Sequence, residues 1–85
     1  MQISITSALG MSTSRSAYDS YHTARLMVAG SPDSLVPLRY EQPLVTLLNL
    51  LQEVEGYEWG PHIELTMSAA QEMAQEVGLE LSFSR

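Results

Sequence analysis

The segment from Pro43 to Glu55 constrains the fold more than any other part of the chain. It reads PLVTLLNLLQEVE, and its apolar residues recur at helical spacing around more than half of the circumference. Proline at the first helical position and Gly56 just past the end mark its boundaries. In a chain of 85 residues, such a helix lies either at the centre of the fold or partly in an interface between chains. The side chains expected on its apolar face are Leu44, Leu47, Leu48, Leu50, Leu51 and Val54.

Two capping patterns predict further helices. Ser16 and Ser68 are each followed three residues later by a residue that completes a capping box, which predicts helices over about 17–28 and 69–77. The prolines between them predict an irregular or short helical connector over 31–39. The chain therefore contains helices on both sides of the leucine-rich segment.

Three segments alternate apolar and polar residues with the period of a half-buried strand: 2–6, 62–66 and 79–84. The stretch 7–16, SALGMSTSRS, is small and polar and reads as a loop. The expected order is β-α-(turn)-α-β-α-β, in one domain over 1–85.

This order predicts a small two-layer α+β fold with a three-stranded sheet, helices on one face and water on the other. A right-handed parallel crossover would join the last two strands. If the last helix instead begins at Thr66, the second strand is reduced to a bridge. The pairing of the first strand stays open.

The net charge is −6, and the negative charge is confined almost wholly to the second half of the chain. Residues 1–40 hold two aspartates and three arginines, whereas residues 41–85 hold eight glutamates and one arginine, and there is no lysine. Nucleic acids and anionic membranes are bound through basic stripes, so neither is an expected direct partner. A basic surface on a partner protein is the natural complement.

The absence of cysteine excludes a disulfide, a thiolate metal site and a thiol nucleophile. The N-terminal residues lack the pattern of a signal peptide, and the most apolar segment, 44–51, is far too short to cross a bilayer. We therefore expect a soluble, cytoplasmic protein.

A hydrolase is one alternative function. Residues 10–14, GMSTS, share the first part of the G-x-S-x-G nucleophile elbow but lack its final glycine. In that alternative Ser12 or Ser14 would be the nucleophile and His22 or His62 the base, and a hydrogen bond between them would decide it. The favoured interpretation of residues 10–14 is a serine-rich loop that has no catalytic role.

Two other polar pairs also have ordinary interpretations. On a strand, His62 and Glu64 would share one face, but two ligands do not make a metal site. For His22, a surface contact near Tyr18 is favoured over a role in a triad. The chain is therefore expected to have no catalytic residue, no metal and no cofactor.

The favoured function is a non-enzymatic acidic module that binds a basic surface of a partner protein, with binding that weakens steeply as salt rises. Many inhibitors, immunity proteins and host-directed phage proteins that counter defence share this size and charge. The turn aromatics are either covers for the core or anchors in a partner. The candidate partner-binding residues are Glu64, Glu72, Glu76, Glu80, Trp59 and Tyr57.

The second alternative is a homo-oligomer, such as a homodimer, assembled through the leucine-rich helix 43–55. Sedimentation at micromolar concentration would decide it, because a clean monomer removes it. The candidate interface residues are Leu44, Leu47, Leu50 and Leu51.

Overall fold

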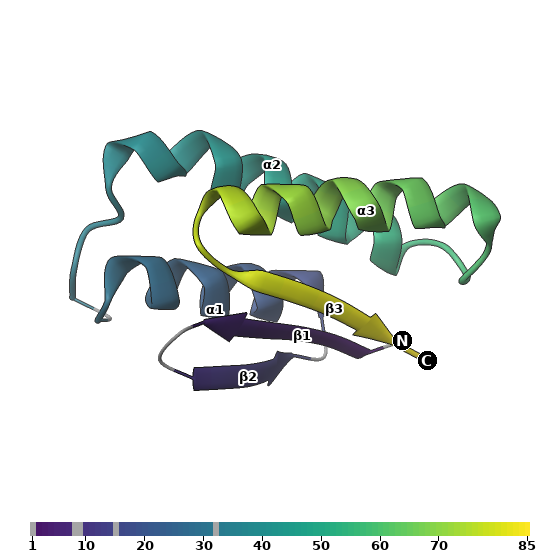
Figure 1. The fold of residues 1–85 in the computed structure, drawn as a ribbon, viewed down its shortest axis with the longest axis horizontal. Coiled ribbons are helices and arrows are strands. Elements are labelled where there is room, and N and C mark those ends of the chain that lie inside the picture. Colours follow the sequence, from purple (N-terminus) through teal and green to yellow (C-terminus); the bar gives the residue numbers. More distant parts are fainter. Residues whose placement is uncertain (1, 8–9, 15, 32) are drawn as a thin grey trace.

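The chain folds as a small α+β domain. The computed structural model describes residues 2–7, 10–14, 16–31 and 33–85, and for residues 10–14 it describes the backbone alone. Each element runs opposite to the one before it, and the helices lie behind and above the sheet in Figure 1. The elements are β1 (Gln2–Ser7), β2 (Gly10–Ser14), α1 (Ala17–Ala29), α2 (Leu38–Glu55), α3 (Pro61–Glu76) and β3 (Glu80–Ser84).

The strands form an antiparallel sheet in the order β2-β1-β3. Ile3 lies opposite Phe83 and Ile5 opposite Leu81, so these apolar side chains share the face that packs on the helices. The strands expected at the two ends of the chain are confirmed. They are direct neighbours in the sheet, and β1 occupies its centre.

The strand expected over 62–66 is wrong, because these residues belong to α3. Pro61 is the first residue of that helix, a position that suits a residue without an N–H. Ile63 and Met67 extend the helical apolar stripe toward the N-terminus, whereas Leu65, the apparent partner of Ile63 in the alternation, is 78% exposed. Five residues are too few to separate a period of two from a helical period. Because this strand is absent, the predicted element order and the predicted parallel crossover are also wrong.

The prediction of a loop over 7–16 is wrong for residues 10–14, which form β2. The backbone of residues 10–14 pairs with β1 in a register that sets Ile3 opposite Ser14 and Ser7 opposite Gly10. GMSTS contains one apolar residue, so apolar alternation could not reveal this strand. Residues 8, 9 and 15 of the same expected loop lie outside the described residues.

Helix α2 is the centre of the core. It contacts α1 on one side and α3 on the other, which its wide apolar face requires. It begins at Leu38, directly after Pro37, so the expected start at Pro43 is wrong; this proline sits inside the helix. Pro43 is the sixth residue of α2 and lies past the first turn, so its missing N–H costs one helical hydrogen bond. Four side chains of α2 are buried: Leu44, Leu47, Leu51 and Val54.

The start of α1 is held by two groups. The Ser16 hydroxyl accepts a hydrogen bond from the Asp19 N–H at 3.0 Å, as its capping pattern predicts. Glu55, at the end of α2, accepts a second one from the Ala17 N–H at 2.7 Å. This carboxylate therefore links two helices that are distant in sequence.

The turn from α3 into β3 is a Schellman motif. The Leu79 N–H bonds to the Ala74 carbonyl at 2.9 Å and the Gly78 N–H bonds to the Gln75 carbonyl at 3.0 Å. Gly78 has a φ of 80°, which is strained for residues with a Cβ. This glycine reverses the chain so that β3 returns along α3.

No helix of the described part of the chain combines the length and the apolar character needed to cross a membrane.

Truncation of Leu47, which is 1% exposed, should destabilise the fold strongly. We expect Leu47→Ala to lower the free energy of unfolding by about 3 kcal/mol, through lost burial and a cavity. Leu38→Ala, in the same helix at a site that is 84% exposed, should change it by less than about 0.5 kcal/mol. Urea unfolding followed by circular dichroism measures both, and equal losses would contradict the assigned core.

The left-handed turn at Gly78 gives a second stability test. We expect Gly78→Ala to cost about 1 kcal/mol because alanine is strained at this φ. The control is Gly56→Ala, because Gly56 has a φ of −76° and space for a Cβ. If both variants unfold at the same urea concentration, Gly78 does not require its left-handed conformation.

Candidate functional site

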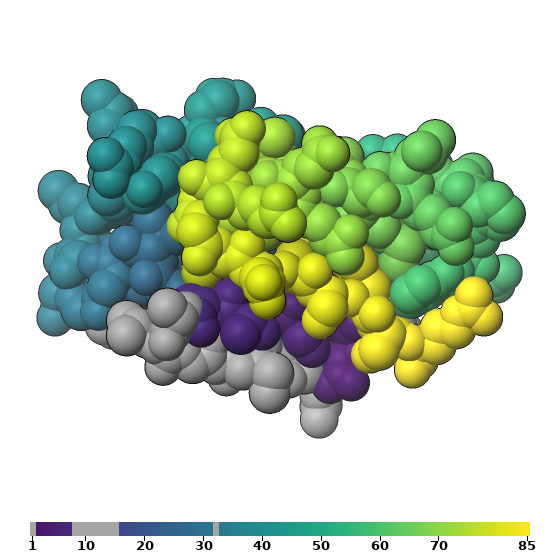
Figure 2. All heavy atoms as spheres, in the orientation of Figure 1, coloured from purple at the N-terminus to yellow at the C-terminus, as the bar shows by residue number. Residues whose placement is uncertain are grey.

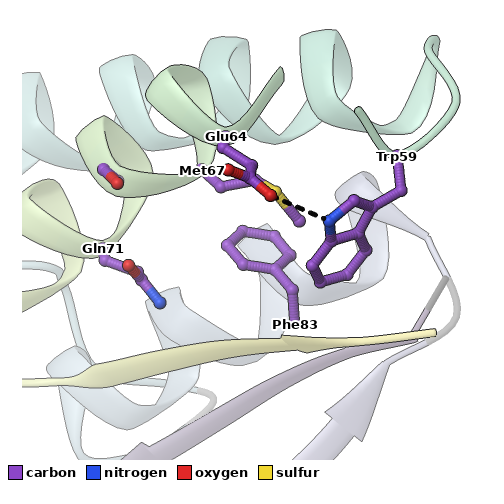
Figure 3. Close-up of a pocket in the computed structure, with 6 residues that line it drawn as sticks. Trp59, Glu64, Met67, Gln71 and Phe83 are labelled. Atoms are coloured by element: carbon purple, nitrogen blue, oxygen red, sulfur yellow. Dashed lines mark hydrogen bonds between the residues drawn. The ribbon is translucent and has the colours of Figure 1, made fainter. Parts of the chain in front are cut away.

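A hollow of about 300 Å³ lies between α3, β3 and the connector before α3. Figure 3 shows that Glu64 and Met67 descend from α3, Phe83 rises from β3, and Trp59 closes one end. In Figure 2, α3 and β3 both lie on the visible face of the molecule. The lining residues are Trp59, Glu64, Met67, Ser68, Gln71 and Phe83.

The apolar base of the hollow belongs to a small satellite of the core. Met67 is buried together with Val54 and Ile63, and Phe83 and Trp59 pack against this cluster while remaining partly exposed. The site is therefore fixed by the packing of α2 on α3, and its two aromatic rings are left accessible from outside.

The polar wall of the hollow contains a carboxylate and an amide. Trp59 Nε1 donates a long hydrogen bond to Glu64 Oε1 at 3.4 Å. Gln71 Nε2 donates to the Leu81 carbonyl at 3.2 Å, so the amide covers part of the outer edge of β3. An uncovered strand edge invites pairing with other chains, and this contact protects it.

Arg85 lies over the Trp59 ring, with Cζ 4.9 Å from the ring centroid. Arg25 and Arg39 lie in the same way over tyrosines, at 5.7 Å and 4.7 Å. In the described part of the chain, every arginine thus has an aromatic partner. Helix α3 itself contains three glutamates and neither lysine nor arginine.

Three of the candidate glutamates share one row of α3. Glu64, Glu72 and Glu76 are exposed and follow the i, i+4 spacing through Ser68. The sequence had placed Glu64 on a sheet face apart from the other two. Because residues 62–66 are helical, Glu64, Glu72 and Glu76 lie on one ridge of α3 beside the hollow.

The remaining candidate residues for partner binding lie elsewhere or are partly covered. Glu80 is exposed on β3 and lines a separate hollow with Thr6 and Gly78. Tyr57 is 57% exposed, and its ring meets His62 edge-on with centroids 6.0 Å apart. Trp59 covers core side chains, which is one of its two expected roles, and keeps a partly exposed surface; its role as an anchor in a partner stays a prediction.

The candidate oligomer residues of α2 face inward. Leu44, Leu47 and Leu51 are at most 1% exposed, and Leu50 is partly buried against the same core. Leu44, Leu47 and Leu51 pack inside the chain because α2 is covered by both other helices, so these three offer no surface to a second copy. Leu50 keeps part of its surface. An oligomer through another face stays a prediction.

The two histidines have aromatic neighbours. His22 Nε2 lies 3.3 Å from the Tyr18 hydroxyl, which confirms the expected contact near Tyr18. The side chains of Ser12 and Ser14 lie outside the described residues, so the hydrolase alternative stays a prediction.

On α3, His62 and Glu64 are two residues apart and point to different sides, so their expected common face is wrong. No cluster of three His, Asp or Glu side chains placed to hold a metal occurs within the described residues.

Sequence reasoning missed four residues that line the hollow, and it missed Arg85, which lies over Trp59. The four lining residues are Met67, Ser68, Gln71 and Phe83. The apolar stripe Ile63, Met67, Ala70, Ala74 could have identified Met67, had the helix been extended back to Pro61. The approach of β3 to α3 is a tertiary contact, and no local pattern of residues encodes it.

The stacking of Arg85 on Trp59 can be tested by fluorescence, because Trp59 is the only tryptophan in the chain. We expect Arg85→Ala to increase quenching of Trp59 by acrylamide, since one cover of the ring is lost, at a stability cost of about 0.5–1 kcal/mol. Arg39→Ala makes the same charge change beside Tyr40 and should leave quenching unchanged. Equal quenching in the wild type and Arg85→Ala would show that the guanidinium does not shield the ring.

The chain matches no protein-family model, no curated protein and no solved structure.

Proposed function

We propose that this chain is a non-enzymatic binding module whose acidic second half docks on a basic surface of a partner protein in the cytoplasm. Inhibition of that partner, as host-directed and anti-defence phage proteins inhibit theirs, is the form of action that suits the size and charge. The observation that carries the proposal is the row of exposed glutamates on α3 beside a hollow that contains Trp59.

Helix stability alone does not account for this row. A carboxylate is stabilising near the start of a helix and destabilising near its end, by about 0.3–1 kcal/mol. Glu64 is in the first turn of α3, but Glu76 is its last residue, and the last turn has no basic residue. Glu72 and Glu76 are also i, i+4 neighbours of like charge, which adds a small penalty. Both glutamates are therefore unfavourable for the helix itself, which supports a role for them in binding.

The hollow supports the same proposal from its shape. Tryptophan is enriched among the few residues that dominate binding energy, and such anchors are surrounded by groups that exclude water. Trp59 presents an accessible ring surface, with Tyr57 exposed nearby in the chain. An acidic ridge for steering and an aromatic anchor for affinity are the two parts that a compact docking surface needs.

Reversal of the ridge charge should remove binding without unfolding the protein. We expect Glu72→Lys/Glu76→Lys to lose partner capture from a lysate of the source organism, quantified by mass spectrometry against wild-type bait. The same variant should unfold at an equal or higher urea concentration, because lysine near a helix end is favourable. Partner retained on wild-type bait should also fall steeply as salt rises.

The matched control is Asp33→Lys/Glu53→Lys, which changes the net charge equally, at two exposed sites away from α3. It should capture the same proteins as the wild type. If both double variants lose the partner to the same extent, net charge rather than the ridge governs binding. Capture that is insensitive to salt would overturn the proposal.

A further inference from the structure

We infer that the hollow beside Trp59 is a receptor for an arginine side chain of the partner. This inference rests on the proposed function, and it specifies which basic group of the partner the surface binds. Its site is the ring of Trp59, the carboxylate of Glu64 and the apolar base formed by Met67 and Phe83 (Figure 3).

The size of the hollow suits a side chain. About 300 Å³ is at the lower limit of sites for small molecules and cofactors. An extended arginine has an aliphatic stem that needs apolar contact and a charged head that needs an acceptor. Met67 and Phe83 provide the first, and Glu64 provides the second.

The geometry of Trp59 and Glu64 suits a planar cation. The 3.4 Å contact places the carboxylate at the edge of the indole ring, so a guanidinium stacked on the ring would lie within reach of both carboxylate oxygens. Oε2 of Glu64 accepts no hydrogen bond from the described residues. The pair therefore offers stacking and a two-point ion pair to the same group.

The chain itself shows that this ring accepts a guanidinium. Arg85 lies 4.9 Å from the ring centroid, yet it does not line the hollow, so the surface of Trp59 that faces the hollow is not taken by it. Arginine is favoured over lysine for such a site because its head is planar, less strongly hydrated and able to bond a carboxylate at two points. Electrostatic attraction alone would not separate the two.

Three tripeptides test the inference: Ac-Gly-Arg-Gly-NH2, its lysine counterpart and its citrulline counterpart, the last being a neutral mimic of arginine. Each is titrated into the protein and followed by Trp59 fluorescence and by the indole N–H signal in NMR. We expect the arginine peptide to bind with a Kd on the order of 1 mM, as suits a ligand of this size. The lysine peptide should bind about fivefold more weakly than the arginine peptide, and the citrulline peptide at least about tenfold more weakly.

Two isosteric variants locate the binding. Glu64→Gln should lower the affinity for the arginine peptide by about fivefold or more. Glu53→Gln, an equal charge change on the exposed side of α2, should lower this affinity by less than about twofold. Urea unfolding of both variants checks that each is folded.

The outcomes separate the inference from the proposed function. If arginine and lysine bind equally, or if Glu64→Gln and Glu53→Gln behave alike, the arginine receptor is overturned and docking by charge can still hold. If no peptide shifts the Trp59 signals at about 10 mM, the receptor is likewise overturned. Loss of partner capture on reversal of Glu72 and Glu76 would then support the proposed function on its own.

Discussion

The structure depends on the burial of one helix face. Leu44, Leu47, Leu51 and Val54 of α2 are almost wholly removed from water, and a chain this short depends strongly on such a face to build its core. Covering this face requires one helix on each side, α1 and α3, and these two helices bring the sheet with them. The position of the hollow beside Trp59 is a consequence of this packing. Val54, at the end of the apolar stripe, packs with Ile63 and Met67 and so fixes the start of α3 over β3.

The sequence predicts those elements whose apolar pattern is long enough to define a period. The α2 stripe and the strands at both ends of the chain were predictable, and so was the cap of α1 at Ser16. The pattern fails where it is short or weakly apolar. HIELT is compatible with a strand over five residues, and its helical character is apparent only when Met67 and Ala70 are read with it. GMSTS carries almost no apolar signal, so alternation of apolar residues does not predict its pairing with β1.

Only part of the candidate site was predictable as residues, and its arrangement was not. The exposed glutamates and Trp59 stand out in the sequence by charge and by rarity. Their convergence depends on α3 beginning at Pro61, which moves Glu64 onto the ridge of Glu72 and Glu76. The apolar base of the hollow depends on Phe83 arriving from the opposite end of the domain, after the reversal at Gly78. Contacts of this kind join segments far apart in the sequence, so local periodicity carries no information about them.

The one-sided charge also limits what can occupy the ridge. Two copies of a chain with a net charge of −6 repel each other most strongly where their glutamates would meet, so self-association through the outer face of α3 is opposed by electrostatics. In the proposed function, the same field would attract a basic partner and orient it before contact. The arginines in the described part of the chain lie over aromatic rings of the chain itself. In the proposed function, the charge would select for basic partners, and the ring of Trp59 beside Glu64 would supply the close contact that distinguishes one basic surface from another.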